Sequence, residues 1–328
     1  MAHTAVRPET DTTPSPAPSP DVAPQNAERV EVSYPNTIRR RSWWRPFTAI
    51  ELALAAFAII NAGLGLGAFL IDTLAGALIA GEAPSMEGGM EFTPSMFLAL
   101  NLSWALMIPV SLGIHAWLYG SARDLLSVVG GFRWPLVRRA LMFAVPVWAA
   151  YAAVGLLAAP TLQFPSGTDL LVFIIVVLTT PLQAAGEEFV FRGLVNRSAA
   201  SWVSRPGMGM LLGAVVSSAA FASMHMAFQP YLIQYYFVFG AALAVVAWRT
   251  GGIEVPVVIH AVHNTCVFAI SMFAGGGTLE ELANRSTADV GPEMLGPSLF
   301  MILVAAVVWG VTAVRPVRRT QSLPARSA

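Results

Sequence analysis

The chain has 328 residues, of which 55% are hydrophobic and only 12% are charged. Soluble domains usually carry about 25% charged residues, so this composition excludes an ordinary soluble domain and indicates several membrane-spanning segments. Nineteen basic and nineteen acidic side chains give a net charge of zero, so the total charge gives no reason to expect a nucleic-acid partner. The single cysteine, Cys266, excludes an intramolecular disulfide and a CxxC metal site.

The first 38 residues differ in composition from the rest of the chain. They include the stretch "PETDTTPSPAPSPDVAPQNAE", which is rich in Pro, Ser, Thr and Asp and has no long apolar run. Such a segment buries too little surface to offset its ordering entropy, and it lacks the charged and apolar regions of a signal peptide. We therefore predict a disordered tail over residues 1–38.

Eight apolar segments follow, each near the roughly 20 residues that a spanning helix needs. The sequence therefore predicts an all-α fold: a polytopic membrane helix bundle of about eight transmembrane helices surrounded by the lipid bilayer. The small residues of "GLGLG" at 63–67 are expected to let neighbouring helices approach closely. The predicted spans are 47–71, 95–118, 137–159, 169–190, 207–227, 231–248, 253–274 and 296–314.

The arginines are distributed unevenly between the two sides of this bundle. Eight spans place both termini on one side, together with "RRRSWWR" at 39–45 and the arginines that follow the second, fourth, sixth and eighth spans. The opposite loops contain one arginine, Arg285. Because basic residues favour cytoplasmic loops, both termini are predicted to be cytoplasmic.

Three segments place strongly polar side chains within or beside these apolar helices. In "EEFVFR" (187–192), Glu188 and Arg192 are four residues apart and share a helix face, so they can pair. Glu187 lies about 100° round the helix from Glu188 and points elsewhere. The other two segments are "FASMH" at 221–225 and "HAVHN" at 260–264.

Each of these polar groups has a structural explanation when taken alone. The Glu–Arg pair fits an ion pair near the interface, and His225 fits a hydrogen-bonded interfacial histidine. His260 and Asn264 share a helix face and fit hydrogen bonds to neighbouring helices. Charged groups in hydrocarbon cost a few kcal/mol or more and usually face a functional interior. The combination therefore predicts a polar active-site cavity within the membrane.

The same side chains fit amide hydrolysis by an activated water. A carboxylate can accept a proton from a water that a histidine orients, and a histidine and an asparagine one turn apart can donate to an oxyanion. No HExxH zinc signature is present, although a glutamate and two histidines on three helices leave a metal site open. Cys266, three residues from His263, allows a Cys–His nucleophile, but a buried cysteine is more often a small apolar residue.

The three segments resemble the motifs of the CPBP family of intramembrane proteases, a group of type II CAAX prenyl endopeptidases and bacteriocin-processing, Abi-like proteins. "EEFVFR" is similar to EExxxR, "FASMH" to FxxxH and "HAVHN" to HxxxN, in the family's order. The resemblance covers about residues 170–270. It implies an eight-helix intramembrane endopeptidase that hydrolyses a peptide bond of a membrane-associated protein or peptide.

The resemblance also implies a task for each motif residue. The family is described both as a metalloprotease and as a metal-free glutamate protease, so a divalent metal such as zinc is left open as a cofactor. The implied tasks are water activation by Glu187 and His225, support of the site and substrate by Glu188 and Arg192, and stabilisation of the oxyanion by His260 and Asn264.

On this basis we divide the chain into four parts: a disordered cytoplasmic tail (1–38), N-terminal transmembrane helices (39–168), a CPBP-like catalytic core (169–274), and a last part (275–328) with the final loop, the final transmembrane helix and a basic C-terminal tail. Abundant Ala, and Arg without Lys, are typical of a high-GC bacterium, so we expect a bacterial cell membrane and do not assume a prenylated substrate.

Two other functions remain consistent with the residues. One is a non-proteolytic binding or immunity protein of the same fold, and the other is a proton-coupled transporter, because buried Glu, His and Arg also form proton relays.

The predicted span boundaries conflict with this site. If the fourth span ends at 190 and the fifth begins at 207, His225 lies about 27 Å further along its helix than the start of that span. Glu187 and His225 could not then share a water. We therefore predict that the helix continues through Arg192 and that Glu187 and His225 face each other in a polar cavity.

Overall fold

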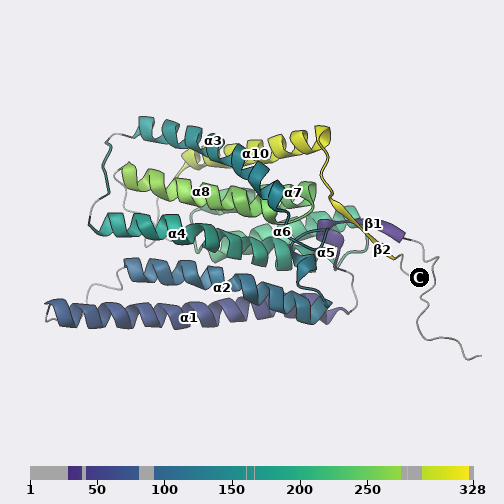
Figure 1. Ribbon diagram of the computed structural model, residues 1–328, viewed down its shortest axis with the longest axis horizontal. Helices are drawn as coiled ribbons and strands as arrows, with labels where there is room; N and C mark the ends of the chain where they lie inside the picture. The colour runs from purple at the N-terminus through teal and green to yellow at the C-terminus, as the bar shows by residue number, and fades with distance from the viewer. Residues whose placement is uncertain are drawn as a thin grey trace, which may run out of the picture.

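The computed structural model describes residues 29–38, 42–80, 92–159, 161–165, 167–274, 279 and 290–324. Among these residues, eight helical segments are long and apolar enough to cross a membrane, and they run lengthwise side by side (Figure 1). The predicted all-α bundle with eight spans is confirmed. Its long helices are α1 (Trp44–Ala80), α2 (Pro94–Tyr119), α3 (Trp134–Ala158), α4 (Thr168–Glu188), α6 (Pro206–Met224), α7 (Pro230–Thr250), α8 (Glu254–Phe273) and α10 (Leu295–Val314).

The fourth span is longer than its apolar run predicts. After α4, the chain continues as a π-helix, η4 (Phe189–Val195), and then as α5 (Asn196–Ala200). Together they form one helical segment of 33 residues, Thr168–Ala200. The prediction that the helix continues through Arg192 is confirmed, and the predicted end of the span at 190 is wrong. The first span is also longer than predicted, since α1 ends at Ala80 and not at 71.

Local sequence explains where several of these helices begin and end. In hydrocarbon every backbone N–H and C=O group needs a partner within the protein, which favours long helices. Pro94, Pro206 and Pro230 occupy the first turns of α2, α6 and α7, where a missing N–H loses no hydrogen bond. Gly120 and Gly251 end α2 and α7 at φ of +93° and +72°, a left-handed conformation that glycine adopts without steric cost.

The helices pack in two groups around the central helix α4. In Figure 1, α1, α2, α4 and α8 lie in a row, each packed against the next, and α3 packs against α8. Helix α6 packs against α7, and α7 packs against α10. Every residue from Gln183 to Ala200 is buried, so the end of α4, η4 and α5 form the centre of the bundle rather than a surface exposed to lipid.

Helices α2 and α4 approach each other closely at Gly186. A Cβ atom there would lie 1.8 Å from the backbone oxygen of Trp104, so α4 meets α2 where no side chain fits. The glycines of "GLGLG" do not have this role: a Cβ atom at Gly63, Gly65 or Gly67 would meet nothing within 4 Å. The expectation of a close helix approach at 63–67 is therefore wrong.

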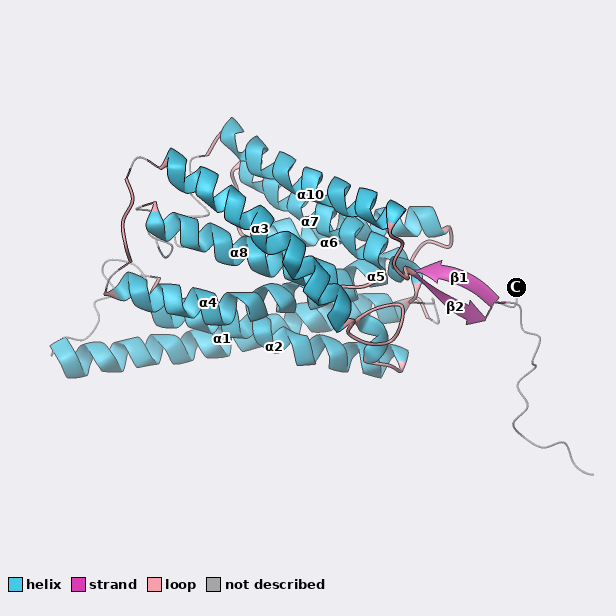
Figure 2. Cartoon of the chain, turned by 45° about the horizontal axis from the view of Figure 1, so that its top comes forward, coloured by secondary structure: helices cyan, strands magenta, loops and turns pink. Residues whose placement is uncertain are grey.

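A small antiparallel sheet, which the sequence analysis did not predict, joins the two ends of the described chain. Strand β1 (Arg29–Ser33) pairs with β2 (Thr320–Pro324) at one end of the bundle (Figure 2). A 3-10 turn, η1 (Tyr34–Asn36), follows β1, and the Tyr34 hydroxyl donates to the carbonyl of Leu125. Burial raises the pKa of Tyr34 well above its usual value. The prediction of disorder over 1–38 is thus wrong for residues 29–38, and residues 1–28 lie outside the described residues.

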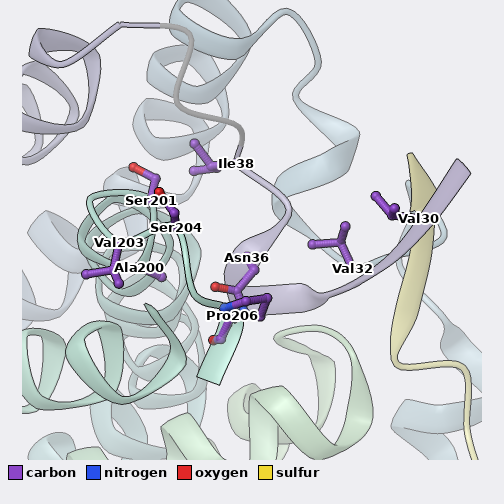
Figure 3. A pocket seen from close by; sticks show the side chains of 9 residues that line it. All are labelled: Val30, Val32, Asn36, Ile38, Ala200, Ser201, Val203, Ser204 and Pro206. Atoms are coloured by element: carbon purple, nitrogen blue, oxygen red, sulfur yellow. Dashed lines mark hydrogen bonds between the residues drawn. The ribbon is translucent and has the colours of Figure 1, made fainter. Parts of the chain in front are cut away.

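The loops at this end of the bundle contact one another and the strands. The Asn36 amide donates to the carbonyl of Pro206 at 3.1 Å, and Ser127 forms a β-bridge with Gly252. Figure 3 shows Asn36 beside Pro206, and Ile38 near Ser201, around a pocket of about 190 Å³. The loops after α2, α5 and α7 and both strands therefore share one end.

We expect Gly186→Ala to destabilise the bundle, because the new methyl group would meet the backbone of α2 and force the two helices apart. Overpacking of this kind costs about 1–3 kcal/mol. Thermal unfolding of the purified protein in detergent should show a lower Tm. The control is Gly63→Ala on α1, where a methyl group has open space and the Tm should stay the same or rise slightly. Equal Tm values for the two variants would contradict the close contact between α4 and α2.

Candidate active site

Glu188 lies at the centre of a buried polar network that connects four helices. Its Oε1 atom lies 3.0 Å from Nη1 of Arg192 and 2.7 Å from Nδ1 of His260 on α8. Arg192 also donates through Nη2 to the carbonyl of Gly240 on α7 at 3.0 Å, and its guanidinium lies over the ring of Phe221 on α6. The predicted pair of Glu188 and Arg192 therefore forms, and it links α4 to α6, α7 and α8.

Glu187 belongs to a second part of the same network. The amide of Gln183, one turn earlier on α4, donates to Oε1 of Glu187, and the amide of Asn264 donates to Oε1 of Gln183 at 3.2 Å. Asn264 also donates to Nε2 of His260 at 3.1 Å, and Nε2 of His260 lies 3.6 Å from Oε2 of Glu187. Five of the six predicted site residues are thus joined by short contacts.

The protonation of His260 follows from its partners. A carboxylate oxygen only accepts, so the hydrogen bond to Glu188 places a proton on Nδ1. In a neutral imidazole Nε2 then accepts, as the contact with the Asn264 amide requires. The carboxylate of Glu188 therefore lies beside one cation, Arg192, and one N–H donor, His260.

His225, the sixth predicted residue, lies at the end of α6. Its Nδ1 atom is 2.8 Å from the carbonyl of Phe221, so Nδ1 carries the proton and Nε2 is the basic nitrogen. The ring stacks on Tyr236 of α7, with centroids 3.9 Å apart and planes at 26°. These contacts define the direction of the imidazole.

A cavity of about 520 Å³ brings the two halves of the site together. Glu187 and His225 both line it, which agrees with the predicted polar cavity, and Gln183 and Asn264 line it too. Its volume is within the roughly 300–1,000 Å³ of small-molecule sites. Its remaining walls are largely apolar and come from α1, α2, the turn after α6, and α8: Phe57, Asn61, Phe92, Phe97, Leu100, Asn101, Trp104, Met224, Met226 and Phe268.

His263 and Cys266 have other partners. Nε1 of Trp148 donates to Nδ1 of His263 at 3.0 Å, and Nε2 of His263 lies 2.7 Å from the hydroxyl of Tyr235. Since an indole N–H can only donate, the His263 proton is on Nε2. The Cys266 thiol donates to the carbonyl of Trp148 at 3.3 Å. Neither side chain is among those that line the cavity, so they do not form a Cys–His nucleophile there.

The donor groups of the site do not form a ready-made metal-binding cluster in this structure. Within the part of the chain that the structure describes, no three His, Cys, Asp or Glu side chains converge in a metal-binding arrangement. Zinc sites need three or four such donors at about 2 Å. The two nitrogens of His260 already have partners in Glu188 and Asn264.

The sequence analysis missed two residues of the site. Gln183 lies four residues before Glu187 on the same helix face and bridges Glu187 and Asn264. A polar residue at this spacing within an apolar run was the available signal. Tyr236, which stacks on His225, had no such signal, because its position depends on how α7 packs beside α6.

Comparison with known proteins agrees with this site. No curated protein and no solved structure matches the chain. Residues 166–266 match a family model described as Rce1-like, type II CAAX prenyl endopeptidase Rce1-like. The match includes all three motifs, from Glu187 to Asn264, and its extent is close to that of the motif resemblance. Residues 166–266 are therefore similar to a type II CAAX prenyl endopeptidase family, which supports the resemblance of this region to CPBP intramembrane proteases.

Proposed function

We propose that the protein is an intramembrane endopeptidase of the glutamate type, in which Glu187 and His225 activate a water for attack on a peptide bond. The observation that carries this proposal is the shared cavity: both side chains line it, although they come from different helices. The basic Nε2 atom of His225 and the carboxylate of Glu187 are both acceptors. A water that donates one hydrogen to each has its lone pairs directed away from both, toward a substrate carbonyl.

In the proposed reaction, Glu187 takes a proton from the water as the oxygen forms a bond to the carbonyl carbon. The carbonyl oxygen becomes an oxyanion in the tetrahedral intermediate. The C–N bond then breaks, and the proton held by Glu187 passes to the leaving nitrogen. No other reactant is needed, and the products are a carboxylic acid and an amine.

Asn264 is the proposed donor to the oxyanion. Its amide lines the cavity, whereas His260 lies behind it, between Asn264 and Glu188. Both amide hydrogens of Asn264 have partners, Gln183 and His260, so one of them has to turn to the substrate. Glu188 and Arg192 do not line the cavity; we propose that they position His260 and the helix that carries Glu187.

The proposed substrate is a membrane-associated protein or peptide. The apolar side chains of α1, α2 and α8 that line the cavity fit an apolar segment beside the scissile bond. The name of the matching family adds prenylated CAAX peptides as one such class, and unmodified membrane peptides are another.

We also propose that the end of the bundle with β1 and β2 faces the cytoplasm of a bacterial cell. The concentration of arginines in the loops on that side supports this orientation. A fluorescent protein fused to the C-terminus should fluoresce, and alkaline phosphatase fused there should be inactive. Active phosphatase with a dark fluorescent protein would reverse the orientation.

We expect Glu187→Gln and His225→Ala each to lower the rate of peptide cleavage at least about 100-fold, because the first replaces the carboxylate base with a neutral amide and the second removes the imidazole that accepts from the reacting water. The assay uses purified protein in detergent with a library of membrane peptides, prenylated and unmodified. Glu51→Gln, at an exposed glutamate of α1, is the matched control and should cleave normally. A chelator should leave cleavage by the wild type unchanged. Cleavage that survives in both variants would place the reaction elsewhere, and cleavage lost on chelation would contradict the glutamate type.

Gln183→Leu should lower kcat about tenfold with little change in KM. Leucine is about as large as glutamine, but it cannot form the hydrogen bonds that Gln183 makes to Glu187 and Asn264. The matched control is Gln234→Leu on α7, whose side chain accepts from Ser298 and does not line the cavity. Both variants should unfold at similar temperatures. Equal kcat values in the two variants would show that Gln183 does not position the catalytic groups.

A further inference from the structure

A second buried arginine, Arg197, lies in α5, directly after the π-helix that contains Arg192. Unlike Arg192, it has no carboxylate within ion-pair distance among the described residues. It is 1% exposed. Its Nη1 atom donates to Nε2 of His115 at 3.1 Å, its Nη2 atom donates to the hydroxyl oxygen of Thr37 at 2.7 Å, and its Nε atom has no hydrogen-bond partner. The ring of Tyr34 lies 4.8 Å from the guanidinium carbon.

These contact partners of Arg197 are neutral. His115 donates through Nδ1 to the carbonyl of Ser121 at 2.6 Å, so its Nε2 atom accepts from Arg197 and the imidazole is uncharged. Within the described residues, no carboxylate forms an ion pair with Arg197, whereas Arg192 pairs with Glu188 and Arg133 pairs with Glu254. Asp124 interacts with Arg197 only at longer range, and a buried charge without a directly paired counter-ion is unfavourable, so a further anionic group beside Arg197 would stabilise it.

A pocket of about 140 Å³ lies beside the guanidinium. Arg197, Thr37 and Tyr119 line it, and the side chain of Gln321 on β2 adds an amide. Asp124, which is half-buried, also lines the pocket but forms no ion pair with Arg197. The pocket therefore presents one positive and one negative group that do not neutralise each other by direct contact.

The pocket lies at the end of the bundle where lipid headgroups are expected. Trp117, on the same turns of α2 as His115 and Tyr119, is 70% exposed, and Trp44 at the start of α1 is 42% exposed. Exposed tryptophans of this kind mark the level of the headgroups. The pocket is also next to the one in Figure 3, and Ile38 lines both; the pocket in Figure 3 has no charged lining residue.

We propose that this second pocket binds a phosphoethanolamine group, with the phosphate beside Arg197 and the ammonium beside Asp124. A phosphate in the pocket adds negative charge beside the buried guanidinium of Arg197, with which Asp124 interacts without forming an ion pair. A phosphate alone would be repelled by Asp124, and the ammonium removes that repulsion. The group is available as the headgroup of a zwitterionic phospholipid or as a free molecule, and the small volume of the pocket fits either. This site is separate from the proposed catalytic function and does not depend on it.

The test is the Tm of the detergent-purified protein in titrations with short-chain phosphatidylethanolamine, phosphatidylcholine and phosphatidylglycerol, and with free O-phosphoethanolamine and inorganic phosphate. We expect phosphatidylethanolamine to raise the Tm at lower concentrations than the other two lipids. A rise with the lipid but not with O-phosphoethanolamine assigns the site to the membrane, and a rise with O-phosphoethanolamine alone assigns it to the free molecule.

Asp124→Asn should weaken the response to the ethanolamine ligand about tenfold and remove its advantage over phosphatidylglycerol, because the ammonium loses its charged partner. Asp124 is half-buried, so this variant should fold even where Arg197→Gln does not. The matched control is Asp169→Asn, at an exposed carboxylate in the first turn of α4, which should respond as the wild type does. The proposal is overturned if no ligand raises the Tm, if phosphatidylglycerol or phosphate acts as well as the ethanolamine ligands, or if Asp124→Asn keeps the preference.

Discussion

The ion pair between Glu188 and Arg192 is the interaction on which the rest of the site depends. Neither charge can reach water, so each needs its partner, and removing one partner of a buried pair costs about 3–5 kcal/mol. The pair has further contacts in three directions, to Gly240 on α7, to Phe221 on α6 and to His260 on α8. It therefore sets the rotation of α4 in the bundle, and Glu187, one residue earlier and about 100° round, turns toward the cavity as a consequence.

The helical segment continues beyond Glu188 as a π-helix, which explains how Glu187 on the fourth span and His225 at the end of the fifth line one cavity. A fourth span that ended at 190 would have put Glu187 at the membrane surface. The segment instead continues through η4 and α5 to Ala200, so Glu187 lies well inside the bundle, opposite the end of α6. A π-turn inserted into an α-helix is often found at functional sites, and here it begins directly after the two carboxylates and contains Arg192, within a stretch whose residues are all buried.

Features that depend on local pattern could be predicted from the sequence, and features that depend on packing could not. Apolar length predicted the eight spans, and the i, i+4 spacing predicted the pairing of Glu188 with Arg192. The π-helix has no local signal, because the apolar run simply ends at charged residues. The pairing of β1 with β2 joins segments nearly 300 residues apart, and the composition of the tail predicted only disorder. Likewise, a close contact between α2 and α4 lies at a single glycine, Gly186, and a Cβ atom at Gly63, Gly65 or Gly67 would have no such contact.

The contrast between Arg192 and Arg197 shows how one helical segment separates two tasks. Arg192 lies deep in the bundle, where only an internal carboxylate can compensate its charge, and that carboxylate is present. Arg197 lies five residues later, near the loops and the strand pair, and is one of the residues that line a pocket there. A purely structural arginine at this position would gain from a carboxylate as close as Glu188 is to Arg192, yet the partners of Arg197 are a neutral histidine, a hydroxyl and an aromatic ring. The guanidinium is held in place, and Asp124 interacts with it only without an ion pair, which is the arrangement expected where a closer counter-ion belongs to a ligand.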